Sequence, residues 1–195
     1  YEQAVRLKPD YADALNNLGA AEARLGRLQE AMGHWEQALR VDPDYSEAHY
    51  NLGLALQQTD KTEEAIAHYV QALRIRPGFA KGHYNLGVAL EQAGRGQEAL
   101  GHYEEAVRIK PDYAEAHNNL GIALQQTGKI KEAIGQYEQA LRIRPDYDKA
   151  HYNLGSALER AGKLPEAIEH YEQALRINPD YAKVRDALAR LPTRQ

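Results

Sequence analysis

A repeat of 34 residues runs through the sequence and limits the folds that are open to it. Six of the eight prolines lie 34 residues apart, and an aromatic residue follows each of them two places later. The prolines are Pro9, Pro43, Pro77, Pro111, Pro145 and Pro179, and the aromatic residues are Tyr11, Tyr45, Phe79, Tyr113, Tyr147 and Tyr181. A fixed period of this length is typical of solenoids and arrays, so we expect a chain built of stacked units.

Each unit is expected to contain two helices. In residues 114–147, apolar residues recur at helical spacing in two runs, from Ala116 to Leu124 and from Ile130 to Ile143. Gly128 lies between the runs, where a residue in the left-handed conformation would end the first helix, and Pro145 ends the second. The residue at the position of Gly128 is Gly26, Gly94 or Gly162 in three other repeats and Asp60 in one.

Small residues in register indicate where the two helices of a repeat meet. The first helices carry Gly19, Gly53, Gly87, Gly121 and Gly155, and the second helices carry Ala31, Ala65, Ala99, Ala133 and Ala167. Glycine inside a helix costs about 0.5–1 kcal/mol relative to alanine, so we expect these glycines to allow a close approach between helices. Large aromatic residues accompany them on the second helices: Trp35, Tyr69, Tyr103, Tyr137 and Tyr171. Helix-spaced aromatic residues usually face a core, so they are expected to be core residues rather than a cofactor site.

These features together resemble the tetratricopeptide repeat (TPR) family over essentially the whole chain. The family's early tryptophan is replaced by Leu15 and by His49, His83, His117 and His151. The resemblance implies an all-α, right-handed superhelical solenoid whose first helices line a concave groove that binds peptides or partner proteins. The expected organisation is a truncated repeat in residues 1–10, five repeats in residues 11–181 and a capping helix in residues 182–195.

The two ends of the chain are expected to differ. Residues 1–7 match the second helix of a repeat that lacks its first half, so Ala4, Val5 and Leu7 would be partly uncovered and could support weak self-association. Near the other end, Arg185 and Asp186 make the final helix polar, as expected for a cap on a solenoid.

Composition excludes several classes of function. Lys and Arg total 24 against 28 Asp and Glu, which argues against nucleic-acid binding. Cysteine is absent, so the chain has no thiolate nucleophile and no cysteine-ligated metal. No apolar run reaches the ~20 residues of a membrane helix, and no phosphate loop or catalytic motif is present. We therefore expect a non-catalytic chain without cofactor or metal, although it could be the arm of a larger enzyme. The sequence assigns no compartment, with the cytoplasm as the default.

Histidines form two rows that are expected to meet in pairs. Because the helices of a repeat are antiparallel, His49, His83 and His151 fall near His68, His102 and His170 respectively. A metal centre needs three or four ligands, and no third ligand is in view. We therefore interpret the pairs as polar packing at the helix interface.

A row of asparagines is the best candidate for a binding surface. It consists of Asn17, Asn51, Asn85, Asn119 and Asn153, with Tyr50, Tyr84, Asn118 and Tyr152 beside it. Asparagine is a poor helix former, so five in register require a reason. One hypothesis is that their amides hold the backbone of an extended peptide; the other is that each bonds the backbone of a neighbouring repeat. The row resembles the concave surface of the repeat arm of O-linked N-acetylglucosamine transferases, whereas the lysine-containing carboxylate clamp of chaperone-binding TPR domains is absent.

Two functions thus remain from the sequence. The favoured one is a non-catalytic scaffold that binds a partner segment across Asn51, Asn85, Asn119 and Asn153, and the alternative is a self-assembly module that stacks end to end. We also predict that residues 78–107, which hold six of the 15 glycines, form the least stable repeat. Replacing Gly82 with alanine and Gly96 with leucine is expected to stabilise it.

Overall fold

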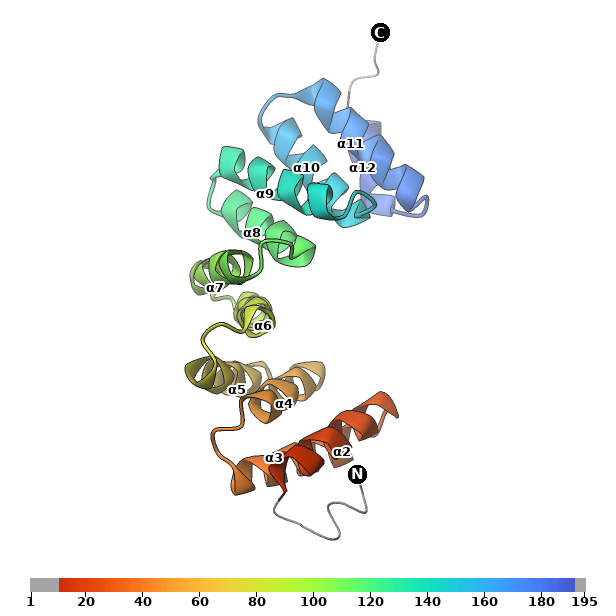
Figure 1. Cartoon of the computed structure of the whole chain (residues 1–195). Helices are drawn as coiled ribbons and strands as arrows, with labels where there is room; N and C mark the ends of the chain where they lie inside the picture. Colours follow the sequence, from red (N-terminus) through yellow and green to blue (C-terminus); the bar gives the residue numbers. More distant parts are fainter. Residues whose placement is uncertain (1–10, 192–195) are drawn as a thin grey trace. The chain divides into compact units, whose positions relative to one another are not determined.

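A computed structural model describes residues 11–191, and over this range all regular secondary structure is helical. The helices are α2 (Ala12–Arg24), α3 (Leu28–Val41), α4 (Ser46–Gln58), α5 (Thr62–Ile75), α6 (Ala80–Gln92), α7 (Gly96–Ile109), α8 (Ala114–Gln126), α9 (Ile130–Ile143), α10 (Asp148–Arg160), α11 (Leu164–Ile177) and α12 (Ala182–Arg190) (Figure 1). The predicted all-α solenoid of helical hairpins is confirmed.

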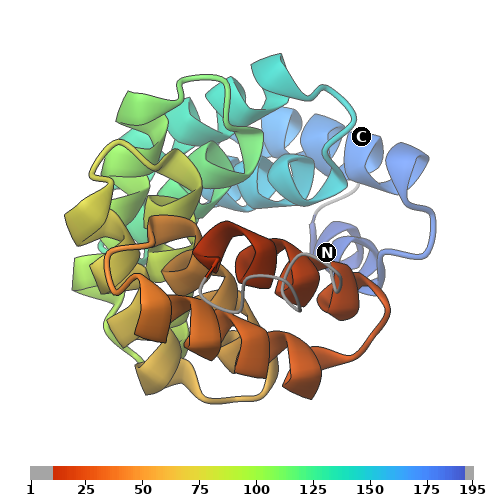
Figure 2. The ribbon, with the colours of Figure 1, turned by 60° about the horizontal axis from the view of Figure 1, so that its bottom comes forward.

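The chain divides into two compact units, Tyr1–His102 and Tyr103–Gln195, with the division inside α7. In the first unit α2 packs against α3 and α4 against α5, while α3 contacts α4 and α5 contacts α6. In the second unit α8 pairs with α9 and α10 with α11, and α9 contacts α10. Figure 2 shows the two helices of the first hairpin, in red and orange-red, side by side.

A left-handed residue ends each first helix, as the sequence predicted. Gly128 has φ 81°, and the amides that follow close the turn: Gly128 N–H donates to Gln125 at 3.2 Å and Lys129 N–H donates to Leu124 at 3.0 Å. This pair of bonds is the Schellman motif, which satisfies carbonyls that a helix end leaves free. Asp60, with φ 59°, has the same role where glycine is missing.

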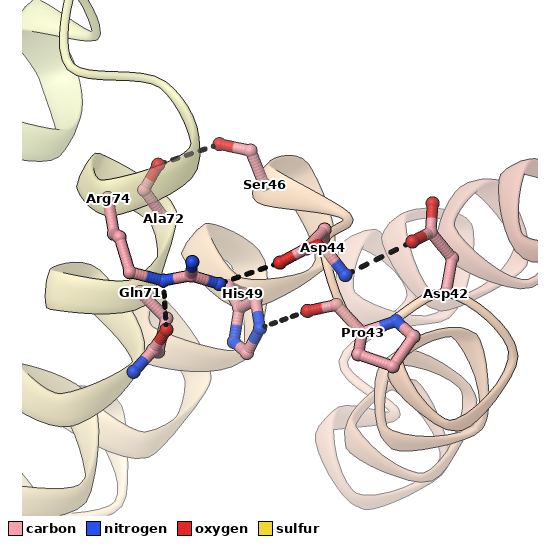
Figure 3. A network of polar contacts seen from close by, with 8 residues as sticks. All are labelled: Asp42, Pro43, Asp44, Ser46, His49, Gln71, Ala72 and Arg74. Atoms are coloured by element: carbon pink, nitrogen blue, oxygen red, sulfur yellow. Dashed lines mark hydrogen bonds and ion pairs between the residues drawn. The ribbon is translucent and has the colours of Figure 1, made fainter.

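The turn after each second helix is held by side chains from the helices around it. Figure 3 shows the turn between α3 and α4, where His49 Nε2–H donates to the carbonyl of Pro43 at 3.1 Å. From α5, Arg74 reaches Asp44 at 2.6 Å, and Ser46 donates to the carbonyl of Ala72 at 3.1 Å. The repeat that follows the turn thus holds it in place through side chains of its own two helices.

The predicted aromatic row forms the core of the hairpins. Tyr69, Tyr103, Tyr137 and Tyr171 are at most 1% exposed and Trp35 is 4% exposed, so they are core residues as expected. The glycines opposite make room mainly for these rings. A Cβ placed on Gly121 would lie 2.5 Å from Tyr137 Cε1, and one on Gly53 would lie 2.7 Å from Tyr69 Cε1.

The expectation that alanine at Gly82 stabilises the chain is wrong in its reasoning, because it left out the packing around this residue. A Cβ at Gly82 would lie 2.9 Å from Phe79 Cδ1 and 3.0 Å from Leu73 Cδ2, so neighbouring side chains already fill this space. The other repeats have alanine at the position of Gly82 and tyrosine at the position of Phe79. Phe79 has no hydroxyl, whereas Tyr45 at the same position donates to Asp13, and the phenyl ring lies against the place of the missing methyl group.

The last helix of the described residues is α12. Val184 and Ala187 are buried, whereas Arg185 and Asp186 are exposed. The predicted uncovered patch of Ala4, Val5 and Leu7 lies outside the described residues. Among the helices that are described, none has the length and apolar character needed to cross a membrane.

Candidate functional site

The asparagine row ties neighbouring first helices together. In the first unit, Asn51 Nδ2 donates to Asn16 Oδ1 at 3.0 Å, which joins α4 to α2. Asn85 Nδ2 donates to the Tyr50 hydroxyl at 2.8 Å, which joins α6 to α4. Both partners are side chains that lie 35 residues back, rather than the neighbouring backbone that one hypothesis proposed.

The second unit repeats this arrangement. Asn153 Nδ2 donates to Asn118 Oδ1 at 2.9 Å, again across 35 residues. Asn118 in turn donates to Asn119 Oδ1 at 3.2 Å, and Asn119 has a long bond of 3.5 Å to the Tyr103 hydroxyl. Asn118 is only 3% exposed, so this predicted groove residue lies within the helix contact and offers little surface to a partner.

The internal bonds leave the side-chain oxygens of three row asparagines available. Asn51, Asn85 and Asn153 are half-buried, and the side-chain amide of each donates one N–H. Among the described residues, nothing donates to the side-chain oxygens of these three asparagines. Each amide is therefore held in a fixed orientation with an acceptor still open. Asn17, at the start of the row, is exposed.

The predicted tyrosines lie beside the row and are half-buried. The Tyr50 ring makes an edge contact with Phe79 at 4.7 Å between centroids, and burial raises the pKa of its hydroxyl. Tyr152 lies 5.9 Å from Tyr171 and 5.4 Å from Tyr181, between the core of its own repeat and the next helix. Tyr84 is half-buried as well.

In the first unit, a pocket of about 280 Å³ opens between α2 and α4. Asn51 forms one wall and the indole of Trp35 forms part of the floor. The rest of the lining consists of Ala20, Ala23, Arg24, Leu28, Leu54, Ala55 and Gln58. Trp35 Nε1 donates to the carbonyl of Asn16 at 3.2 Å, which fixes the indole.

In the second unit, a pocket of about 250 Å³ opens between α8 and α10 at the equivalent place in the repeat. It is lined by Ile122, Gln125, Gln126, Tyr137, Tyr152, Asn153, Ser156 and Arg160. Here the lining is polar and interconnected, since the Tyr137 hydroxyl donates to Gln125 Oε1 at 3.0 Å and Gln125 Nε2 lies 3.4 Å from Ser156 Oγ.

Sequence reasoning places the row correctly on the first helices but misses the pocket floors. It assigns Trp35 and Tyr137 to the core alone, yet an edge of each reaches the pocket beside the asparagine. The signal is present in the sequence, because Gln57 and Gln125 recur in register and accept from the hydroxyls of Tyr69 and Tyr137.

Comparison with known families decides what kind of repeat this is. One tetratricopeptide repeat model matches residues 10–77 and 79–146, and a second matches residues 118–182. The chain belongs to the tetratricopeptide repeat family. The TPR fold is that of protein–protein interaction scaffolds. A comparison with curated protein sequences gave no match.

Solved TPR structures share the fold along nearly the whole chain. YrrB, described as a TPR protein with an unusual peptide-binding site, is 23% identical with a TM-score of 0.84, covering 96% of this chain and 97% of its own. A MamA structure is 25% identical with a TM-score of 0.76, covering 85% and 96%. PilF of Pseudomonas aeruginosa is 23% identical with a TM-score of 0.79, covering 89% and 79%.

The histidines of this TPR chain meet in the pairs that the sequence predicted. The two Nδ1 atoms are 2.9 Å apart in His49/His68, 3.1 Å in His83/His102 and 3.0 Å in His151/His170. Within the described part of the chain, no group of three or more potential ligands could hold a metal. Burial first, and then the facing histidine, lowers the pKa of His68 and of His170.

Proposed function

We propose that this TPR chain is a non-catalytic scaffold whose two units each bind an extended segment of a partner protein along the asparagine row. The observation that carries the proposal is the pair of pockets at the same register. Each has a row asparagine as a wall and a core aromatic ring in its floor. The resemblance to the asparagine-lined arm of O-linked N-acetylglucosamine transferases supports the same use of the row.

The open carbonyl oxygens of the row suit the backbone of a peptide. An extended segment presents N–H groups that a side-chain carbonyl can accept. Because Asn51, Asn85 and Asn153 are already held by an internal hydrogen bond, binding would cost little side-chain entropy. Such contacts hold a backbone without selecting its side chains, so selectivity has to come from the pockets.

The two pockets would select different side chains. The pocket of the first unit has small apolar walls at Ala20, Ala23 and Leu54, which fit an aliphatic or aromatic side chain. The pocket of the second unit offers Gln125 and Ser156 instead, which fit a side chain that forms hydrogen bonds.

The experiment selects random linear peptides on the whole chain and then fills one pocket with residues that other repeats already carry. Ala20→Ile with Ala23→Gln copies Ile122 and Gln125, so the fold should tolerate the change. Peptides that bind the first unit should lose most of their affinity. Gly33→Ala, an exposed change with no atom within 4 Å, is the matched control. Peptides that bind the filled variant as well as the parent chain would exclude this pocket.

Replacing the row asparagines with alanine tests the proposed contacts to the peptide backbone. Asn51 and Asn85 are replaced together in one variant and Asn119 and Asn153 in another, so that each unit is tested separately. Two lost bonds of about 0.5–1.5 kcal/mol each correspond to a roughly five- to 150-fold weaker Kd. Circular dichroism checks that the helices persist, since these changes also remove internal bonds. Unchanged affinity in both folded variants would refute the role of the row.

A further inference from the structure

A larger pocket, of about 630 Å³, lies on the second helices of the C-terminal unit, between α9 and the turn that leads into α11. It is lined by Ile130, Lys131, Ile134, Gly135, Glu138, Arg160, Ala161 and Lys163. Only Arg160 also borders the pocket beside Asn153. The volume is within the range of about 300–1,000 Å³ that is usual for ligand sites.

The charges at its rim differ from those at the equivalent place in the first unit. There, Glu63 on α5 faces Arg95 before α7, with Oε2 and Nη1 3.7 Å apart. In the second unit the same two positions are Lys131 and Lys163, so an ion pair is replaced by two cations. Both lysines are exposed, and neither forms an ion pair with any residue that the structure describes.

The apolar floor is correspondingly more open. Ile66, which lies three residues after Glu63 on α5, is buried at 6% exposure. Ile134, at the same position of the next hairpin but one, is half-buried and lines the pocket together with Ile130 and Ala161. Apolar surface beside unpaired cations suits a ligand that is both anionic and hydrophobic.

We propose that this pocket binds an acidic–aliphatic peptide segment of a partner protein, with a carboxylate between Lys131 and Lys163 and an aliphatic side chain on Ile130 and Ile134. Arg160 lies on the same rim as a third cation. Glu138, the one carboxylate in the lining, disfavours a segment that is acidic along its whole length. The site is separate from the asparagine row and does not depend on it.

The test uses the whole chain and two amidated pentapeptides, one with two glutamates between leucines and one with glutamines in their place. Isoleucine methyl NMR reports where they bind. The glutamate peptide should shift the Ile130 and Ile134 signals, and the glutamine peptide should bind about tenfold more weakly or not at all. Asn119→Ala with Asn153→Ala should leave these shifts unchanged, which separates this site from the part of the asparagine row that lies in the same unit.

Lys131→Glu is the decisive variant, because it restores the acid–base pair that the first unit carries and should therefore fold. It should weaken the glutamate peptide about tenfold or more, whereas Lys149→Glu, which makes the same charge change on α10, should not. Equal affinity of the Lys131 variant would overturn the proposal. So would binding of decanoate without the peptide, or concentration-dependent broadening of the Ile134 signal alone, which would assign the pocket to a small amphiphile or to a second copy of the chain.

Discussion

The contact between Gly121 and Tyr137 provides a test in which the same substitution has opposite effects at two sites of one hairpin. Gly121→Ala on α8 should destabilise the chain, although alanine is the better helix former. Gly135→Ala on α9 should stabilise it. The difference follows from the space around each glycine and not from the helices themselves.

The magnitude follows from the geometry. A Cβ on Gly121 would lie 2.5, 2.8 and 2.9 Å from Cε1, Cδ1 and Cζ of Tyr137. The ring is 1% exposed and its hydroxyl is bonded to Gln125, so it cannot turn away without breaking that bond. Overpacking of this kind costs about 1–3 kcal/mol, against a gain of about 0.5–1 kcal/mol in helix propensity. We expect a net loss of about 1–2 kcal/mol.

A Cβ on Gly135 would meet no atom within 4 Å, so only the helix gain of about 0.5–1 kcal/mol applies. The Tm, measured by circular dichroism during thermal unfolding, should be about 2–8 °C lower in the first variant and about 1–4 °C higher in the second. Amide hydrogen exchange in α8 and α9 assigns the change to this hairpin. Stabilisation by both substitutions would refute the close-contact explanation.

Other predictions concern the histidine pairs and the third repeat, which contains residues 78–107. The pKa of His68 and of His170 is lowered below the ordinary 6.5 in the folded chain, so the unfolded chain binds protons more readily. The free energy of unfolding should therefore be highest above about pH 6.5 and fall as the pH drops below that value. Urea unfolding near pH 8 and near pH 5 measures this loss, and His68→Gln, which copies the His117–Gln136 pair, should reduce it. Gly101→Ala, with open space around it, should stabilise the third repeat by about 0.5–1 kcal/mol in urea unfolding, whereas Gly82→Ala should bring no gain. Amide exchange should be faster in residues 81–107 than in residues 115–141, and equal protection would contradict a weak third repeat.

The fold could be predicted because its determinants are local and repeated. Gly128 and Asp60 end their helices through their own backbone conformation, and Pro145 through its missing N–H, so each acts within a few residues of the sequence. The five-fold repetition then separates these signals from chance. The pairing of His83 with His102 also followed, because a hairpin with a short loop fixes which residues face one another.

Contacts between repeats were less accessible to sequence reasoning. Asn51 bonds Asn16 and Asn153 bonds Asn118, each one residue beyond the period, an offset that depends on how neighbouring hairpins are rotated. Likewise, the crowding at Gly82 depends on where the Phe79 ring settles without a hydroxyl. Lys131 and Lys163 lie in separate repeats. That two cations replace an ion pair there can be recognised only from the contact between Glu63 and Arg95 at the same positions of the first unit.

The bond between Asn85 and Tyr50 allows the two roles of the asparagine row to be separated. Asn85 donates to the Tyr50 hydroxyl, and a hydroxyl can reverse its part and donate to a carboxylate. Asn85→Asp should therefore keep the link between α6 and α4 while it presents acceptors only. If the row binds a peptide backbone through its carbonyl oxygens, peptides selected on the first unit should bind this variant at least as well as the parent chain, because a charged acceptor strengthens the bond. Asn85→Leu, which has similar size and no polar group, should lose that binding. Loss of affinity in the aspartate variant, measured by fluorescence anisotropy on folded protein, would show that the amide acts on its partner as a donor and would refute the orientation proposed for the row.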